Sequence, residues 1–307
     1  MHTPHLKRLA KYALFCAPLA VVACDDDDTV TPPAVVDNSP SVVLSGNDNF
    51  SSLVTALTDA NLVATVDGLD SATVFAPNNA AFAAVDLSGV SDADLRATLL
   101  YHVVGGTSIE ASQILGSTSP IVVRASDNST PSLVVEHDGT NVTVNNANVV
   151  TADIATDNGV AHEIDQVLMM PDVVDLATYF DGLSSLVTAL TDVQLVEALR
   201  EAEDVTVFAP TNTAFSQTPT TGLSSEQIAD ILRLHVVPAV AFSGELRDSM
   251  MVPTLVEDEM LLIRASGSSP SGFTVQGSNG IARNIMTVDV RGTNGVVHTI
   301  DGVLLAN

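Results

Sequence analysis

Residues 73–82 read TVFAPNNAAF and residues 206–215 read TVFAPTNTAF, so one distinctive stretch occurs twice, 133 positions apart. The nine residues SSLVTALTD also occur twice at this distance, at 51–59 and at 184–192. A period of this length exceeds that of a solenoid repeat and indicates two complete domains in tandem. The repeat therefore decides the architecture of the chain.

Each copy changes from helical to strand-like periodicity along its length. Apolar residues between Phe50 and Val66 recur at helical spacing, and Ser224 to Gln227 resembles a capping box that opens a second helix. The later third of copy one is rich in short strands separated by turn residues, at 132–135, 141–144 and 147–152. Helices followed by strands within one copy predict an α+β domain.

The repeated TVFAP stretch itself predicts a structural element. We expect a short buried strand that ends at Ala-Pro, because Pro77 and Pro210 have no N–H for a ladder bond. Asn78 and Thr211 then suit the N-cap of the following helix. The Asn-Gly pair at 158–159, repeated in copy two, predicts a hairpin turn between two apolar strands.

The spacing of later matches predicts where the copies differ in length. Arg124-Ala125-Ser126 recurs 140 positions later as Arg264-Ala265-Ser266, whereas Asn158-Gly159-Val160 recurs 136 positions later. These distances predict a seven-residue insertion before Arg264 in copy two and a four-residue deletion after it, both in surface loops.

The N-terminus has the pattern of a bacterial lipoprotein. A basic region with Lys7, Arg8 and Lys11 precedes an uncharged, mostly apolar run of 12 residues, which is too short to span a bilayer. The run ends at Ala23-Cys24, which resembles the site where such a Cys is acylated and the chain is cut before it. We expect a signal peptide at 1–23 and lipidation of Cys24, with an ordinary signal peptide as the alternative.

Composition separates a tether from the two domains. Residues 25–40 read DDDDTVTPPAVVDNSP and favour a solvated segment without a core. We therefore expect an acidic, Pro-rich tether at 24–40, domain 1 at 41–171 and domain 2 at 172–307. The whole chain has 11 basic and 37 acidic residues, and removing residues 1–23 leaves 8 arginines and no lysine, a net charge of −29. Such a field excludes a nucleic-acid-binding role.

Three motifs in a fixed order carry a family resemblance. TVFAP is followed by Tyr101-His102-Val103-Val104 or Leu234-His235-Val236-Val237, and then by NGVAHEIDQVL at 158–168 or NGVVHTIDGVL at 294–304. This order resembles the fasciclin domain, twice over, across residues 41–307. The resemblance implies a wedge of two β-sheets flanked by helices, an extracellular role in adhesion and matrix binding, and no shared enzymatic activity.

Four histidines form two repeated pairs, His102 with His162 and His235 with His298. By periodicity all four lie on apolar faces, so they are read as buried, hydrogen-bonded core residues or as surface binding residues. A metal site lacks a convincing third ligand in either copy. The resemblance implies that the Tyr-His segment can contact a partner, which carries over to Tyr101, His102 and His235, since Leu234 replaces the tyrosine in copy two.

Together these features predict a lipid-anchored protein of the cell envelope that acts as an adhesion or matrix-binding module. Its expected partner is an extracellular or envelope protein or polysaccharide, and the membrane is reached through the lipid alone. We expect no enzyme activity, cofactor, metal or catalytic residue, because the chain has no GxSxG, HExxH or phosphate-loop motif. The alternative is a periplasmic or surface protein that binds a small molecule or carbohydrate between its two domains.

Overall fold

The computed structural model describes residues 37–86, 89–117, 120–124, 130–218 and 222–307. The proposed signal peptide, Cys24 and the tether before Asp37 lie outside the described residues, so these remain predictions. Residues 37–307 form one compact unit. In the part of the chain that the structure describes, no single helix is long and apolar enough to cross a membrane; one helix pair, Val173–Tyr179 with Asp181–Asp192, meets that test only as a unit bent by 111°.

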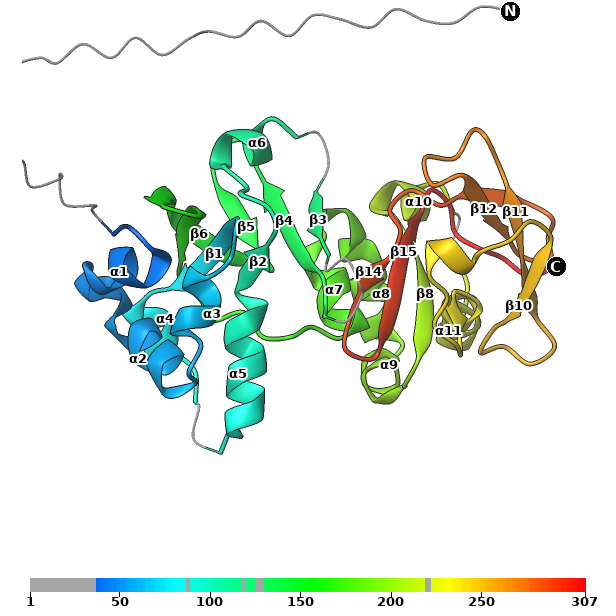
Figure 1. Ribbon diagram of the computed structural model, residues 1–307. Helices are drawn as coiled ribbons and strands as arrows, with labels where there is room; N and C mark the ends of the chain where they lie inside the picture. The colour runs from blue at the N-terminus through cyan, green and yellow to red at the C-terminus, as the bar shows by residue number, and fades with distance from the viewer. Residues whose placement is uncertain (1–36, 87–88, 118–119, 125–129, 219–221) are drawn as a thin grey trace, which may run out of the picture. The chain divides into compact units, whose positions relative to one another are not determined.

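Copy one is a helical layer followed by a mixed sheet, as predicted (Figure 1). Its helices are α1 (Pro40–Ser45), η1 (Asp48–Phe50), α2 (Ser51–Asp59), α3 (Val63–Asp67), α4 (Asn79–Ala83), α5 (Asp92–Tyr101) and α6 (Ala111–Leu115). Its strands are β1 (Ala72–Pro77), β2 (Val103–Gly105), β3 (Ile121–Val123), β4 (Leu133–His137), β5 (Val142–Val144), β6 (Ala147–Thr156) and β7 (Gly159–Ile164).

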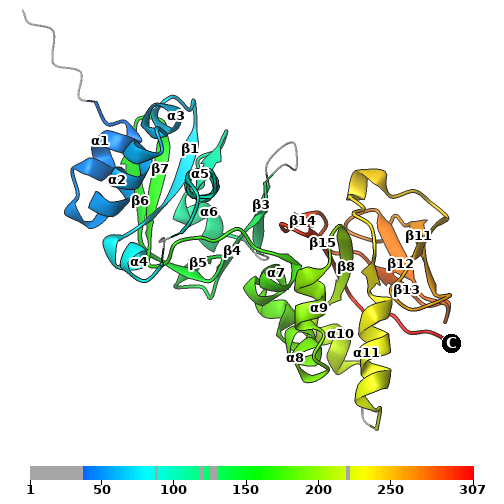
Figure 2. The same cartoon turned by 90° about the horizontal axis from the view of Figure 1, so that it is seen from below.

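The helices of copy one form where the sequence supplies apolar spacing and caps. The repeated SSLVTALTD becomes α2, whose Leu53 and Leu57 lie four residues apart and are buried. The side chain of Asn78 accepts the Ala81 amide at 3.0 Å and begins α4, which confirms the predicted N-cap. Both views show α1 and α2 beside β1 and β6 (Figure 2), and the buried leucines of this layer pack on β1.

The sheet of copy one has the strand order β2-β1-β7-β6-β5-β4-β3, with β1 and β7 as its only parallel pair among the described strands. The predicted hairpin joins β6 to β7, where Thr156 pairs with Gly159 across Asp157-Asn158. Along β6 the register shifts twice near Asp153, a residue with φ of +56°. This bulge lets one long strand serve both halves of the sheet.

The predicted buried strand is confirmed as β1, and it ends at Ala-Pro as expected, with both of these residues still paired in the sheet. It continues through Ala76 and Pro77, and Pro77 pairs with Ile164 of β7. The amide of Phe75 bonds toward the β2 side, to the His102 carbonyl, while that of Asn78 bonds to Ile164 on the β7 side. By this alternation the nitrogen of Pro77 faces the β2 side beyond the end of β2, where no strand needs its N–H.

Copy two repeats the same order of elements. Its helices are α7 (Val173–Tyr179), η2 (Asp181–Leu183), α8 (Ser184–Asp192), α9 (Val196–Glu201), α10 (Asn212–Ser216), α11 (Ser225–Leu234) and η3 (Ser243–Glu245). Its strands are β8 (Val205–Pro210), β9 (Val236–Val237), β10 (Met250–Pro253), β11 (Met260–Ala265), β12 (Phe273–Gln276), β13 (Ala282–Asn284), β14 (Val290–Arg291) and β15 (Gly295–Ile300). The Ser224 capping box is confirmed at the start of α11.

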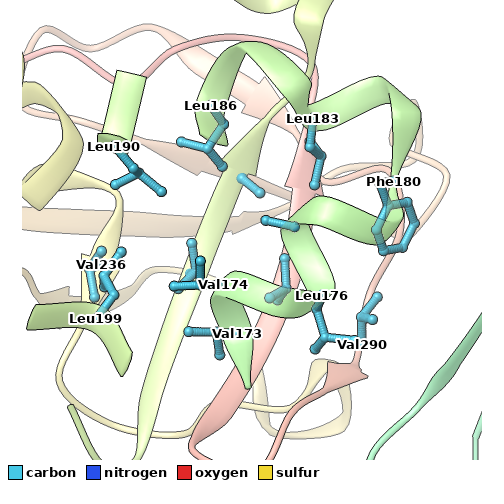
Figure 3. Packing of buried hydrophobic residues seen from close by; sticks show 14 of the residues in the cluster. Val173, Val174, Leu176, Phe180, Leu183, Leu186, Leu190, Leu199, Val236 and Val290 are labelled. Carbon is cyan, nitrogen blue, oxygen red and sulfur yellow. The ribbon is translucent and has the colours of Figure 1, made fainter. Parts of the chain in front are cut away.

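The strands of copy two form two four-stranded sheets, β14-β15-β8-β9 and β10-β11-β12-β13. Strands β13 and β14 stand where copy one has the single long β6, and a bridge between Ile285 and Ile300 links the two sheets. In Figure 3 the apolar side chains of α7 and α8 gather over β8 and β15 to form the core of the first sheet.

Strand pairing corrects the predicted insertion before Arg264. Arg124 follows β3, the edge strand, whereas Arg264 lies in β11, the next strand inward. The pair Val122–Val134 in copy one corresponds to Met251–Leu262 in copy two, so the offset between copies falls to 129 and 128 there. Copy two is therefore shorter before β10 and longer after β11, and the shared Arg-Ala-Ser letters do not mark equivalent positions.

Candidate functional site

Tyr101 lies at the end of α5 with its side chain only 6% exposed. Its hydroxyl donates to the carbonyl of Ser132 at 2.7 Å and accepts from the Asn145 side-chain amide at 2.7 Å. Asn145 accepts the Val134 amide in turn, so the tyrosine fastens α5 to β4 and to the turn before β6. Burial raises the pKa of Tyr101, which keeps the phenol protonated and able to donate.

His102 and His235 occupy the same buried place in the two copies, each 1% exposed. Nδ1 of His102 lies 2.7 Å from the Thr98 carbonyl, and Nε2 accepts the Leu168 amide at 2.8 Å. His235 repeats this arrangement with the carbonyl of Ile231 and the amide of Leu304. Because Nε2 must accept, each ring is neutral with its proton on Nδ1. Burial lowers the pKa of both histidines to about 4.

His162 and His298 carry the second repeated device. Each ring stacks on a phenylalanine of the central parallel strand, Phe75 or Phe208, with centroids 5.6 Å apart. Nε2 of His162 bonds to the Ile109 carbonyl at 2.8 Å, and Nδ1 accepts the amide of Asp153 in the β6 bulge. His298 repeats both bonds, so this pair holds the bulge against the segment after β2 or β9.

The sequence-predicted site residues are therefore brought into the core rather than to the surface. The structure gives Tyr101, His102 and His235 internal hydrogen bonds on every polar side-chain atom. A role for them in partner contact stays a prediction, and it has to act through the backbone and the surface that they hold in place. Among the described residues, no group of three or more His, Cys, Asp or Glu is arranged to hold a metal ion.

Tyr101 is linked to copy two through Ser132, whose carbonyl accepts the tyrosine hydroxyl and whose other polar groups bond to copy two. The Ser132 amide donates to the Arg291 carbonyl at 2.8 Å, and the Arg291 amide donates to the Ser132 hydroxyl at 2.9 Å. Arg291 also lies over the ring of Phe242, 5.7 Å from its centre. The tyrosine that distinguishes copy one is therefore one residue away from the contact between the copies, which we call the inter-copy junction.

Further polar contacts complete the inter-copy junction. Arg124 donates to the Val288 carbonyl at 3.0 Å and lies 3.6 Å from the Asp289 carboxylate. Glu136 accepts the Asp181 amide at 3.2 Å, and its carboxyl pKa is raised by burial. Sequence reasoning missed these residues as a site, because Arg124 lies in a repeated Arg-Ala-Ser stretch that does not mark equivalent positions and the others lie outside the repeated motifs.

A cavity of about 430 Å³ lies beside this junction. Glu136 and His137 line it from copy one, while Phe180, Asp181 and Thr299 are among the residues that line it from copy two. His137 bonds through Nε2 to the Ser117 carbonyl and accepts the Gly139 amide at Nδ1. The cavity thus combines apolar walls with a few polar groups, as small-molecule sites do.

Acid should destabilise the fold through the two buried neutral histidines. Their folded pKa of about 4 lies below the ordinary 6.5, so the unfolded chain binds more protons as pH falls between these values. Stability is thus complete above about pH 6.5 and declines toward pH 4, by roughly 3 kcal/mol for each histidine at about 1.4 kcal/mol per pKa unit. Urea unfolding at pH 7.0, 5.5 and 4.5 measures this slope.

The matched control for this pH dependence is the pair His102→Asn and His235→Asn. An asparagine amide can donate to the same Thr98 or Ile231 carbonyl, but it does not titrate. The double variant should be less stable at pH 7 and lose stability less steeply below pH 6.5. An unchanged slope in that variant would show that other groups cause the acid sensitivity.

Comparison with known proteins identifies the repeated unit. A family model described as the Fasciclin domain matches residues 48–171 and again residues 181–306, one match in each copy. The chain is also similar, with a TM-score of 0.52 and 21% identity, to a solved FAS1 domain pair from the insect cell adhesion molecule Fasciclin I. That similarity covers 85% of this chain and 98% of the solved one, and it shows a shared tandem α+β fold.

The chain is also similar in sequence to proteins from a cyanobacterium and a fungus. The uncharacterized protein sll1735 of Synechocystis is 33% identical over 44% of this chain and 98% of its own length. Protein sll1483 of the same organism is 33% identical over 50% of this chain and 86% of its own length. A fasciclin-like arabinogalactan protein, elcF of Phaeosphaeria nodorum, is 27% identical over 91% of this chain and 92% of its own length.

Proposed function

This chain belongs to the fasciclin domain family, and from that premise we propose that it is a cell-envelope lipoprotein whose two domains act as an adhesion or matrix-binding module. Fasciclin domains are adhesion-type modules without a shared enzymatic activity, and two of them account for most of the described chain. The observation that carries the proposal is that both copies match this module while the polar groups of their motifs are used within the core. Because these polar groups are occupied within the core, a partner would be bound by the outer surfaces of the two domains.

The anchor is part of the proposal and rests on the sequence around Cys24. A Cys24 that carries two or more acyl chains holds a protein stably on a membrane, whereas one chain holds it only marginally. The acidic, Pro-rich segment that follows would keep the domains away from the lipid surface. The net charge of −29 after removal of residues 1–23 favours neutral or basic partners over anionic ones.

Cells that lack this protein should attach several-fold less well to glass coated with matrix extracted from the same cells. Restoring the wild-type gene should restore attachment, whereas Cys24→Ala should not, because the variant has no thiol to acylate. Counting attached cells after a fixed wash measures the effect. Equal attachment of all strains would refute the adhesion role.

Protease treatment of intact cells provides the matching test of location. Digestion of both domains places them outside the cell and supports adhesion, whereas full protection until the outer barrier is opened supports a periplasmic role. A periplasmic marker protein that survives the treatment is the control.

A second candidate function, small-molecule binding, is favoured by the cavity beside the inter-copy junction. Its volume suits a small ligand, and Glu136 and Asp181 would select against anions. Phe180 is the aromatic residue that lines it in the described part of the chain, which is little for stacking against a carbohydrate ring. We therefore rank this candidate below adhesion.

A further inference from the structure

The outer face of β3 and β4 in copy one is covered by copy two. Val134 on this face is 1% exposed and belongs to the core cluster of α7 and α8, and Val122 on the neighbouring strand packs against the same cluster. Strand β3 is the edge strand of the copy-one sheet, and β4 is its neighbour. Copy one therefore uses its outer edge to dock the helical layer of the next domain.

Copy two has the same face, and nothing in the described part of the chain covers it. By strand register Met251 of β10 corresponds to Val122, and Leu262 of β11 corresponds to Val134. Met251 is 52% exposed, Leu262 is half-buried, and Met260 beside them is 37% exposed. These three residues form an apolar patch on an open sheet edge, which we call the outer face of copy two.

The surface that would fit this face is the helical end of copy one, residues 45–48 with residues 152–155. It corresponds to the part of copy two that already meets copy one, since Asn79 bonds to the Asp48 carbonyl as Asn212 does to that of Asp181. The Asp153 amide bonds to His162 as that of Asp289 does to His298. Nearly all of these residues are exposed in this chain.

One pair of opposite charges is matched across these two unused surfaces. Within the chain, Glu136 of β4 accepts the backbone amide of Asp181. In copy two, the strand position of Glu136 is held by Arg264, which is exposed and has the carboxylate of Asp248 as a charged neighbour within the chain. Asp48, the counterpart of Asp181, is also exposed. If the same contact formed between two molecules, Arg264 of one would lie beside Asp48 of the other. Within the chain, this place is taken by Glu136, which accepts the Asp181 amide.

A second pair of positions differs in the same coordinated way. The polar contact of Ser132 with Arg291 would be replaced by Met260 with Ala155, because register places Met260 at the Ser132 position and Ala155 at the Arg291 position. A polar pair becomes an apolar pair, so neither member is left without a suitable neighbour. These two replacements are matched on both surfaces, whereas the Arg124–Asp289 ion pair is not repeated, because Pro253 and Asp153 hold the corresponding positions.

We propose that the outer face of copy two docks the helical end of copy one of a second molecule, so that the chain associates head to tail with itself. This proposal deepens the proposed adhesion function by naming one partner, a second copy of this chain. The contact is heterologous and uses a different surface on each side, so it generates an open row of molecules rather than a closed dimer. Lipid-anchored chains would line up by this contact along one cell surface or between two.

Charge reversal tests the proposal on the full mature chain in detergent micelles, with sedimentation velocity as the measure of association. Arg264→Glu and Asp48→Arg should each weaken association at least tenfold, and the double variant should restore it. Net charge alone gives a different result. Arg264→Glu makes the acidic chain more negative and Asp48→Arg makes it less so, so general repulsion predicts opposite effects.

The apolar part of the face has its own matched control. Met251→Gln should weaken association, whereas Met169→Gln, at a methionine that is equally 52% exposed but lies on neither surface, should not. Melting curves exclude misfolding as the cause in each variant. A wild-type chain that stays monomeric, or an Asp48→Arg variant that associates more strongly, overturns the proposal.

The two proposals fail separately. Monomeric behaviour with normal attachment of cells to the matrix coat overturns self-association alone. Head-to-tail association without any effect of the protein on attachment overturns the adhesion role alone.

Discussion

Gly159→Ala should destabilise copy one by more than about 3 kcal/mol, beyond the usual range for a point substitution. Gly159 begins β7 directly beside Ala72 of the parallel strand β1, with φ of +148°. A Cβ built on Gly159 would lie 1.9 Å from the carbonyl oxygen of Ala72, and 3.0 Å from two more backbone atoms. Backbone atoms of a central strand cannot move aside, so the parallel pair itself has to separate.

Differential scanning calorimetry measures this effect against a matched control. Gly182→Ala adds the same methyl group at a glycine where nothing lies within 4 Å of the new Cβ, so its melting temperature should change little. Gly295→Ala should repeat the damage in copy two, because its Cβ would lie 2.2 Å from the Val205 carbonyl oxygen. If Gly159→Ala melts like wild type, the close approach of β1 and β7 is wrong.

Gly159 also illustrates which features of the fold can be predicted from the sequence. The Asn-Gly pair correctly predicted a hairpin between two apolar strands, because that signal is local. The reason for the glycine is not local, since the demand comes from β1, more than 80 residues earlier. Periodicity also predicted helices, strands and caps correctly, because these signals are local. Strand order and the place of Pro77 in β1 depend on partner strands, which one segment of sequence does not reveal.

The wrong insertion before Arg264 has a related cause. The three identical letters do not stand at equivalent positions, because β3 and β11 occupy different places in their sheets. Sheet register is set by pairing with neighbours, and a short polar stretch at a strand end carries little of that information. The motifs with internal partners, such as the paired histidines, kept their correspondence because each side chain bonds to the same elements in both copies.

The candidate site was predicted only in part. The burial of the four paired histidines follows from their apolar faces, and it is one of the two interpretations that the sequence left open. The inter-copy junction depends on Ser132, Glu136 and Arg124, whose positions in the sheet hold different residues in copy two. Their function depends on a surface of the other copy, so no pattern within one copy could indicate it.

Tyr101→Ala should cost about 3–5 kcal/mol, as expected for truncating a buried aromatic side chain. Its ring packs with Ile109, Ile114 and Leu133 in the copy-one core. Truncation also leaves the Ser132 carbonyl and the Asn145 amide without their partner, which adds a penalty for buried polar groups. The unfolding free energy from a urea titration measures the loss.

Tyr101→Phe separates the packing from the hydrogen bonds. It keeps the ring and removes only the hydroxyl, so it should cost about 1–3 kcal/mol. The loss should also loosen Ser132 from Arg291, so the two copies should unfold in more clearly separated transitions than in wild type. Leu234→Phe in copy two is the control, because the matching position there has no such bond to another domain.

These variants also decide how the Tyr-His segment relates to binding. If Tyr101→Ala and His102→Ala abolish attachment of cells while leaving the melting curve intact, the two side chains act at a surface and their buried placement is wrong. If Tyr101→Phe lowers attachment only as far as it separates the copies, the segment acts by holding the inter-copy junction. The burial of Tyr101 and His102, at 6% and 1% exposure, predicts the second outcome.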